Sequence, residues 1–234
     1  MTGVTLGIET SGFEGSIALR RDGALVDEYI LDRRRHAQTL VSQVQTLLRK
    51  HQLTTRGVDL VAVSQGPGSF TGLRVGVVFA KTFAFATGCR LAAVDTLQAV
   101  AMAAPDGIDH VSAVSDAQRE QVFVGNYTRS SGGRWEQSKA VHVLGISAWC
   151  DHAARQARIG FAVSGPGLSR VAEQLPETIQ ILPPTLWNPQ ASQIASIGEE
   201  LAERDEFADA TLLEPFYLRR SSAEEKRDAR RAGA

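Results

Sequence analysis

The sequence has few cysteines, few aromatic residues and almost no excess charge. Its 234 residues include two cysteines, Cys89 and Cys150, which stand in no metal-binding or redox spacing. Two thiols in a chain of this length favour a reducing compartment over a disulfide framework. Lys and Arg number 25 against 26 Asp and Glu, which leaves a net charge of -1. This balance argues against a strongly basic nucleic-acid-binding protein.

Long apolar runs and a targeting segment are also missing. The most apolar long stretch, residues 75–87, is interrupted by Lys81 and is too short to span a bilayer. The chain opens on the strand-like VTLGIET, without a basic region or cleavage site before it. We therefore expect a soluble, cytoplasmic protein with no membrane partner. Hydrophobic residues make up 43% of the chain, which is enough for a sizeable core.

The first half is predicted to begin with three strands joined by tight turns. Gly12 and Gly15 mark the first turn, and Asp22-Gly23 is a two-residue hairpin signal. Helical periodicity and short apolar runs then alternate. The predicted elements are a helix at 36–51, a strand at 60–65, a helix at 73–87, a strand at 90–96 and a helix at 96–104.

The second half repeats this order after the break at 105–107. Its predicted elements are strands at 110–116, 121–128 and 134–143, a helix at 146–157, a strand at 161–165, a helix at 168–175, a strand at 178–182 and a helix at 188–204 opened by Asn188-Pro189. Two copies of a mixed α/β unit imply a cleft between them. We expect domains at 1–105 and 108–215, with part of the tail 216–234 joining the first.

The strongest local motif is the glycine-rich segment between the strand at 60–65 and the helix after it. Its glycines permit close backbone approach, and the following helix start could hold an anion. No Gly-Lys-Ser/Thr follows, so it is not a Walker A loop. A tight turn with helix capping explains the segment equally well. The candidate residues are Gly66, Gly68, Ser69, Thr71 and Gly72.

Polar residues end the first strand of each half. Glu9, Thr10 and Ser11 follow one apolar run, and Asp116 ends the equivalent run in the second half. Carboxylates facing each other across a cleft would suit a metal or general-base role, and the hydroxyls would suit a phosphate. An ordinary polar turn explains each site when it is taken alone.

No residue stands out as a catalytic group or a metal ligand. Five histidines show no spacing that marks a base, and Ser69 is not in a G-x-S-x-G elbow. A helical metal site at His36 would need a second histidine four residues later, where Leu40 stands. We therefore assign no catalytic residue and no metal.

Several segments together resemble the TsaB (YeaZ) family. They are LGIETSGFEGSIAL, His36-Ala37-Gln38, SQGPGSFTGLRVGV, Asp116-Ala117 and Glu214-Pro215-Phe216-Tyr217-Leu218-Arg219, in the family's order from residue 4 to about 220. The resemblance implies the ASKHA fold of actin-like ATPases, with two ribonuclease-H-like halves whose mixed sheets are flanked by helices. Some members of the family carry a "glycoprotease" label, for which these residues supply no nucleophile or metal.

The resemblance also implies a role. TsaB is similar to the catalytic subunit TsaD and pairs with it; with the ATPase TsaE they transfer threonylcarbamoyl to the adenosine beside the tRNA anticodon. TsaD carries a His-x-x-x-His metal motif, which Leu40 interrupts here. The chain is therefore expected to be a non-catalytic partner needing no cofactor, while ATP and Mg²⁺ are used by the partner subunits. Glu9 where Asp is usual, Gln118 where Arg is usual and Gln121 where an acid is usual weaken any nucleotide site.

In the resembling proteins two helices of the first half pack against the same helices of a partner. Here these are the helices at 36–51 and 73–87, and the second is apolar on most sides. An isologous homodimer could use the same patch when TsaD is absent. A fully buried core helix would explain the same composition. The expected interface residues are His36, Leu40, Val41, Val44, Leu47, Leu48, Val75, Phe79 and Phe83.

Three other functions compete with this interpretation. An active ASKHA kinase or ATPase would bind and turn over ATP alone, and a metalloprotease would need a zinc site. A direct tRNA-binding module would use the cluster Arg33–Arg35 and the arginine-rich tail, with steeply salt-dependent RNA binding.

Overall fold

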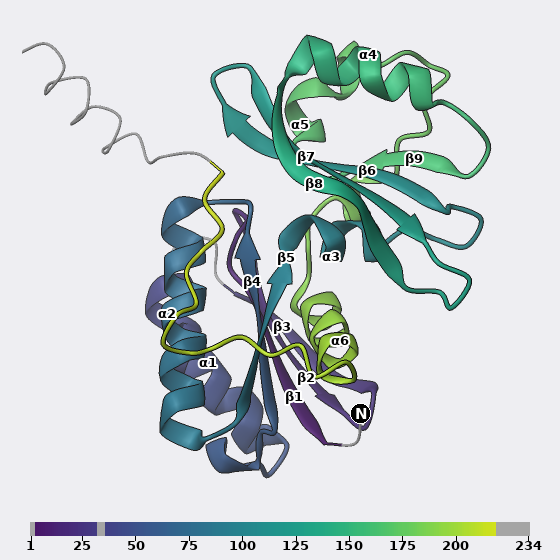
Figure 1. Ribbon diagram of the computed structural model, residues 1–234. Coiled ribbons are helices and arrows are strands. Elements are labelled where there is room, and N and C mark those ends of the chain that lie inside the picture. Colours follow the sequence, from purple (N-terminus) through teal and green to yellow (C-terminus); the bar gives the residue numbers. More distant parts are fainter. Residues whose placement is uncertain (1–2, 32–35, 219–234) are drawn as a thin grey trace, which may run out of the picture.

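The computed structural model describes residues 3–31 and 36–218, without the side chains of residues 36 and 37. Each half of the chain forms one mixed sheet flanked by helices, and the two halves form separate lobes (Figure 1). The expected duplication is present in the strand order. The first sheet runs β3-β2-β1-β4-β5, and the second runs β8-β7-β6-β9. When the strands of each half are counted along the chain, both sheets have the order third, second, first, fourth, and the first sheet adds a fifth strand.

The first sheet begins with an antiparallel meander and continues with parallel strands. At its hairpin, Asp22 and Gly23 both have positive φ, as the sequence signal predicted. β1 pairs antiparallel with β2 and parallel with β4. The five strands are β1 (Val4–Glu9), β2 (Gly15–Arg21), β3 (Ala24–Leu31), β4 (Leu60–Gly66) and β5 (Arg90–Asp95).

Helices cover both faces of this sheet. α1 (His36–Lys50) and α2 (Phe70–Thr87) lie on one face, and α6 (Ala191–Ala202) lies on the other (Figure 1). A short 3₁₀ turn, η1 (Thr55–Gly57), leads from α1 toward β4. The apolar stripe of α1 packs into the core between helix and sheet, which is what an amphipathic helix on a sheet requires.

The second sheet is also covered on both faces. α3 (Thr96–Met102) packs on one face, and α4 (Ile146–Gln156) with α5 (Leu168–Val171) packs on the other. The strands are β6 (His110–Gln118), β7 (Gln121–Arg129), β8 (Trp135–Gly145) and β9 (Phe161–Ser164). The fully buried Trp149 anchors α4, and its indole N–H donates to Ser112 Oγ at 3.2 Å.

Three predicted elements between residues 168 and 204 differ from the structure. The expected strand at 178–182 is a single bridge between Val163 and Ile181, followed by the 3₁₀ turn η3 (Pro184–Leu186). The expected helix at 168–175 ends early in the 3₁₀ turn η2 (Ala172–Gln174). α6 begins after Gln190, whose backbone N–H donates to Gln193 Oε1 at 2.9 Å, so the predicted Asn188-Pro189 cap is wrong.

The domain division expected at residue 215 differs from the packing. The chain returns to the first lobe with α6, where Ile194 and Ile197 join a core cluster with strands β4 and β5. Residues 208–216 then follow the first sheet, with the Ala208 N–H donating to the Leu91 carbonyl at 2.8 Å. In Figure 1 this yellow segment runs along α2. An apolar stripe shows that a helix is buried, but it does not show on which sheet.

A buried hydrogen-bond cluster joins the lobes at α3. Asp95 ends β5 and caps α3 by accepting from the Leu97 N–H at 2.9 Å. The Tyr127 hydroxyl of β7 donates to the same carboxyl group. Burial raises the pKa of Asp95 to about 6, because its effect outweighs that of these hydrogen bonds, which lower the pKa. The side-chain amide of Gln98 donates to the Trp135 carbonyl at 2.7 Å, so α3 is tied to the second sheet at two points.

Replacing Gly198 by Ala should destabilise the fold. In a helix interior this change ordinarily stabilises by about 1 kcal/mol. A Cβ at Gly198 would lie 2.4 Å from Ala62 Cβ, so α6 would have to move off the sheet. We expect the free energy of unfolding to fall by about 1–3 kcal/mol, measured by urea denaturation. Gly132→Ala is the control, since its nearest neighbour would be 3.9 Å away; equal effects of the two changes would contradict this packing.

Candidate functional site

The glycine-rich segment connects β4 to α2, as the sequence predicted. Ser69 is the N-cap residue, and its Oγ accepts a hydrogen bond from the Gly72 N–H at 3.3 Å. This side chain satisfies one of the free N–H groups of the helix start. Thr71 is exposed in the first turn of α2. The structure therefore shows the capping, and an anion site at this helix start stays a prediction.

The glycines serve close packing against the end of β1. A Cβ on Gly68 would lie 2.6 Å from the Ser11 carbonyl oxygen, and one on Gly72 would lie 2.0 Å from the Thr10 carbonyl oxygen. The Thr10 hydroxyl donates to the Gly72 carbonyl at 2.8 Å, and the Ser69 N–H donates to the Ser11 carbonyl at 2.7 Å. The fold thus brings together the polar end of β1 and the glycine segment, as the sequence analysis expected of one site. In this structure the two segments form hydrogen bonds with each other.

The C-terminal segment covers the same loop from the other side. The Phe216 N–H donates to the Gln65 carbonyl at 2.7 Å, and a Cβ on Gly66 would lie 2.8 Å from the Phe216 carbonyl oxygen. Tyr217 stacks on Phe70 with ring centroids 4.7 Å apart. The Arg74 Nε donates to the Tyr217 hydroxyl at 3.0 Å, and the guanidinium lies 3.9 Å from the Phe70 ring centroid. Only the family resemblance at residues 214–219 singled out this segment beforehand.

Glu9 is fully buried beneath the loop. Its Oε1 accepts hydrogen bonds from the N–H and the hydroxyl of Ser11. The Ser64 hydroxyl lies close enough to lower the pKa, yet within the described residues neither Glu9 Oε2 nor Ser64 Oγ has a hydrogen-bond partner of normal geometry. Burial outweighs these hydrogen bonds and raises the pKa of Glu9 to about 7. The carboxyl group therefore titrates inside the protein and does not face a cleft.

Asp116 lies at the exposed tip of the second sheet. It accepts from the Gln118 N–H at 2.7 Å and forms an ion pair with Arg170, also at 2.7 Å. The adjoining hairpin has positive φ at Gln118, Arg119 and Glu120, a conformation that non-glycine residues rarely adopt. Glu9 is buried in the first lobe and Asp116 is exposed and ion-paired on the second, so a joint role of the two carboxylates stays a prediction.

Nucleotide binding by these residues stays a prediction. The backbone of Thr10, Ser11 and Phe216 packs closely against the glycines, at the positions that glycine side chains would take. Within residues 3–31 and 36–218, no three His, Cys, Asp or Glu side chains converge in a way that could hold a metal ion. The side chain of His36 lies outside the described residues, as do Arg33–Arg35 and the tail 219–234, so these expectations stay predictions.

Most of the expected interface residues are part of the monomer core. Five side chains that were assigned to a partner surface are buried between the helices and the sheet: Leu40, Val44, Leu47, Leu48 and Phe83. That assignment is wrong, because helical periodicity identifies the face that packs, and here this face meets the chain's own sheet. Val41 on α1 remains exposed, and Val75 and Phe79 on α2 are half-buried.

α2 nevertheless keeps an apolar outer face. Val78 is 61% exposed and Phe85 is 87% exposed, seven residues apart and therefore on the same side of the helix. Length and composition alone would let α2 cross a membrane, a test that core helices of soluble proteins also pass. Its opposite side, with Leu73, Val77 and Ala80, packs against the first sheet.

Comparison with known proteins decides the family. The family model described as "TsaD: tRNA N6-adenosine threonylcarbamoyltransferase" matches residues 31–227. The "tRNA threonylcarbamoyladenosine biosynthesis protein TsaB" of Bacillus subtilis is 30% identical over 225 residues, which are 94% of this chain and 96% of that protein. The chain belongs to the TsaB (YeaZ) family. The Escherichia coli protein of the same name is 32% identical over 140 residues, 58% of this chain and 61% of its own.

Solved structures of the TsaB (YeaZ) family share the fold. "YeaZ from Pseudomonas aeruginosa" superimposes with a TM-score of 0.79 at 26% identity, covering 93% of this chain and all of the other. A second Pseudomonas aeruginosa structure, described as similar to peptidase YEAZ, gives a TM-score of 0.81 at 27% identity with the same coverage. The expected ASKHA fold of two mixed sheets flanked by helices is thereby confirmed.

Glu9 should make the stability of this TsaB protein fall as pH rises. Because the folded-state pKa is raised, the neutral form of Glu9 is favoured, and its contribution is full below pH 4.5 and lost as pH rises through about 7. Glu9→Gln stays neutral, so its free energy of unfolding should gain about 2–3 kcal/mol relative to wild type between pH 5 and pH 8. Urea denaturation at several pH values measures this. The free energy of unfolding of Glu136→Gln, a change at an exposed position, should depend on pH as that of wild type does. The same pH dependence for Glu9→Gln and wild type would refute the raised pKa of Glu9.

Proposed function

We propose that this chain is a non-catalytic partner subunit that binds a TsaD-like paralogue and supports threonylcarbamoyl transfer to the adenosine beside the tRNA anticodon. Family membership supports a role in tRNA threonylcarbamoyladenosine biosynthesis. TsaB relatives are named for this process, and the Bacillus subtilis protein aligns over nearly the full length. The complex would also contain a TsaE-like ATPase and tRNA as substrate. Its expected cytoplasmic location belongs to the same proposal.

The filled glycine loop supports the non-catalytic role. An active ASKHA enzyme would need open backbone beside the glycines, and here the backbone of Thr10, Ser11 and Phe216 packs closely against them. Glu9 and Asp116, the two candidate carboxylates, are engaged by Ser11 and by Arg170. We infer that ATP and Mg²⁺ act through the partner subunits and that this chain requires no cofactor.

The apolar outer face of α2 is the observation that carries the partner role. Val78 and Phe85 lie on it, half-buried Val75 adjoins it, and exposed Val41 adds an apolar side chain on the neighbouring α1. Clustered exposed apolar side chains of this kind mark protein interfaces. A paralogue with the same fold presents equivalent helices, so it can cover this face, and a second copy can do so in isolation. We call Val41, Val75, Val78 and Phe85 the outer helix face.

Phe85→Asp should weaken binding to a TsaD-like partner. The change places a charge on the outer helix face, where binding would bury it without a counter-charge. We expect at least a tenfold rise in Kd by calorimetry, and loss of the homodimer in sedimentation analysis. Ile159→Asp is the matched control, because Ile159 is also fully exposed but lies in the second lobe. Equal binding of Phe85→Asp and wild type would refute this interface.

Phe83→Asp should instead unfold the chain. Phe83 is only 8% exposed and belongs to the core between α2 and the sheet, with Phe79 stacked on it at 5.8 Å. Burying an unpaired carboxylate there should lower the free energy of unfolding by about 3 kcal/mol or more, while Phe85→Asp, two residues along the helix, changes it little. Thermal denaturation followed by circular dichroism checks this, and a Phe83→Asp variant as stable as wild type would remove the distinction between the two faces.

Reconstitution tests the function as a whole. The chain is mixed with a TsaD-like subunit, a TsaE-like ATPase, the adenylate-forming enzyme, ATP, Mg²⁺ and tRNA, and modified tRNA is measured. We expect modification to require this chain and to fall with Phe85→Asp but not with Ile159→Asp. Modification of equal extent without the chain would overturn the proposed role, and ATP turnover by the chain alone would favour an active ASKHA enzyme.

A further inference from the structure

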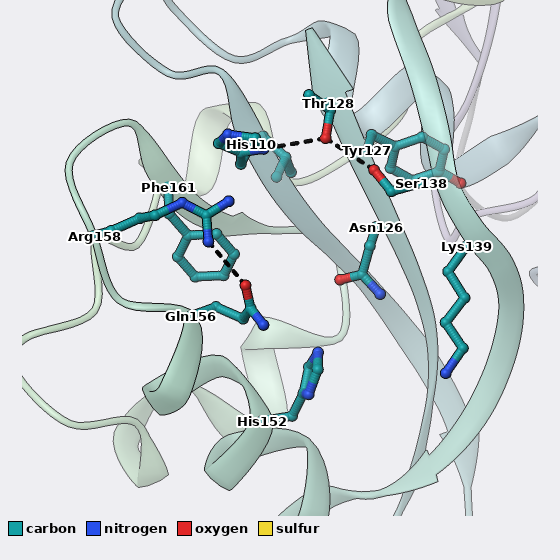
Figure 2. A pocket seen from close by; sticks show the side chains of 11 residues that line it. His110, Asn126, Tyr127, Thr128, Ser138, Lys139, His152, Gln156, Arg158 and Phe161 are labelled. Atoms are coloured by element: carbon teal, nitrogen blue, oxygen red, sulfur yellow. Dashed lines mark hydrogen bonds between the residues drawn. The ribbon is translucent and has the colours of Figure 1, made fainter.

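A concave pocket lies in the second lobe, on the face of the sheet that carries α4. It has a volume of about 310 Å³, at the lower end of the range for small-molecule sites. The sheet supplies its floor, since His110 pairs with both Thr128 and Phe161 in the strand register. The last turns of α4 and the loop after it form the opposite wall, with His152, Gln156 and Arg158 (Figure 2).

Every polar side chain that lines this pocket can donate a hydrogen bond, and no carboxylate is among the lining residues. Asn126 and Lys139 are opposite each other in the β7–β8 register, which places their side chains on the same face. Within the described residues, neither side chain forms a hydrogen bond or an ion pair, and the His152 ring forms none either. Figure 2 shows Asn126 and His152 pointing toward the space between strand and helix.

Three further contacts position side chains of the pocket. Arg158 donates from Nη1 to Gln156 Oε1 at 2.9 Å, which orients the guanidinium and leaves its other N–H groups available. The hydroxyls of Thr128 and Ser138 lie 2.8 Å apart, and His110 Nδ1 lies 3.1 Å from the Thr128 hydroxyl (Figure 2). Burial lowers the pKa of His152, and the nearby positive charges of Arg155, His142 and Lys139 lower it further.

We propose that this pocket binds a small phosphorylated organic molecule. Lys139 extends from β8, while His152 on α4 and Arg158 after it lie on the opposite wall, so the phosphate is recognised by two charged donors and the His152 ring (Figure 2). Asn126, Thr128 and Ser138 supply the neutral polar groups that suit sugar hydroxyls. A pocket of this size suits a small ligand better than an RNA backbone. Proteins bind an RNA backbone along grooves or rows of exposed basic residues.

The test uses the full chain, with ribose 5-phosphate, inorganic phosphate and a short RNA hairpin as probes. We expect saturable binding of ribose 5-phosphate by calorimetry, tighter than that of inorganic phosphate, with shifts of the Asn126 side-chain amide signals in NMR spectra. Lys139→Gln and Arg158→Gln should each weaken binding about tenfold, since each removes a charged hydrogen bond. Circular dichroism confirms that both variants fold.

Arg56→Gln, which makes the same charge change in an exposed turn of the first lobe, should bind like wild type. Equal weakening by Arg56→Gln would show non-specific charge attraction and overturn the proposal. So would equal affinity for inorganic phosphate, absence of binding, or binding of the RNA hairpin alone. The pocket and the outer helix face lie in different lobes, so each proposal can fail without the other.

Discussion

The contact between the end of β1 and the start of α2 is the constraint on which the first lobe depends. The two backbone segments are in direct contact there, because the Thr10 and Ser11 carbonyl oxygens occupy the positions that side chains on Gly72 and Gly68 would need. Two direct hydrogen bonds then join the segments, from the Thr10 hydroxyl and from the Ser69 N–H. Because α2 is held so close to the sheet, its inner side becomes core and its outer side remains exposed and apolar.

The same contact bears on the proposed non-catalytic role of the chain. A glycine segment at a strand-to-helix turn can hold a phosphate only if its backbone faces open space. In this chain the end of β1 and the C-terminal segment around Phe216 face it instead. Glu9 is thereby sealed below the loop, and its raised pKa is a consequence of that burial. Family membership and this filled loop together support a role through surfaces.

Sequence patterns identified most elements but could not assign their neighbours. The hairpin at Asp22-Gly23, the helix at 36–51 and the strand at 60–65 were found because turn chemistry and periodicity are local properties. The placement of α6 was missed, because its apolar stripe fits either sheet. Leu40 and Phe83 were assigned to a partner for a related reason: a pattern of apolar residues cannot tell whether the surface that buries them belongs to the same chain.

By itself, the sequence determined the strand and helix order, the duplication and the family, since these depend on local periodicity and on motifs such as GPGSFTG. Only the tertiary structure decided which glycines are tightly packed, that Glu9 is buried while Asp116 is exposed, and that Val78 and Phe85 form the outer face while Phe83 lies within. It also gathered Asn126, Lys139, His152 and Arg158, which are scattered along the chain, around one pocket. The physical reason is that burial and proximity arise from contacts between distant segments, which no short stretch of sequence contains.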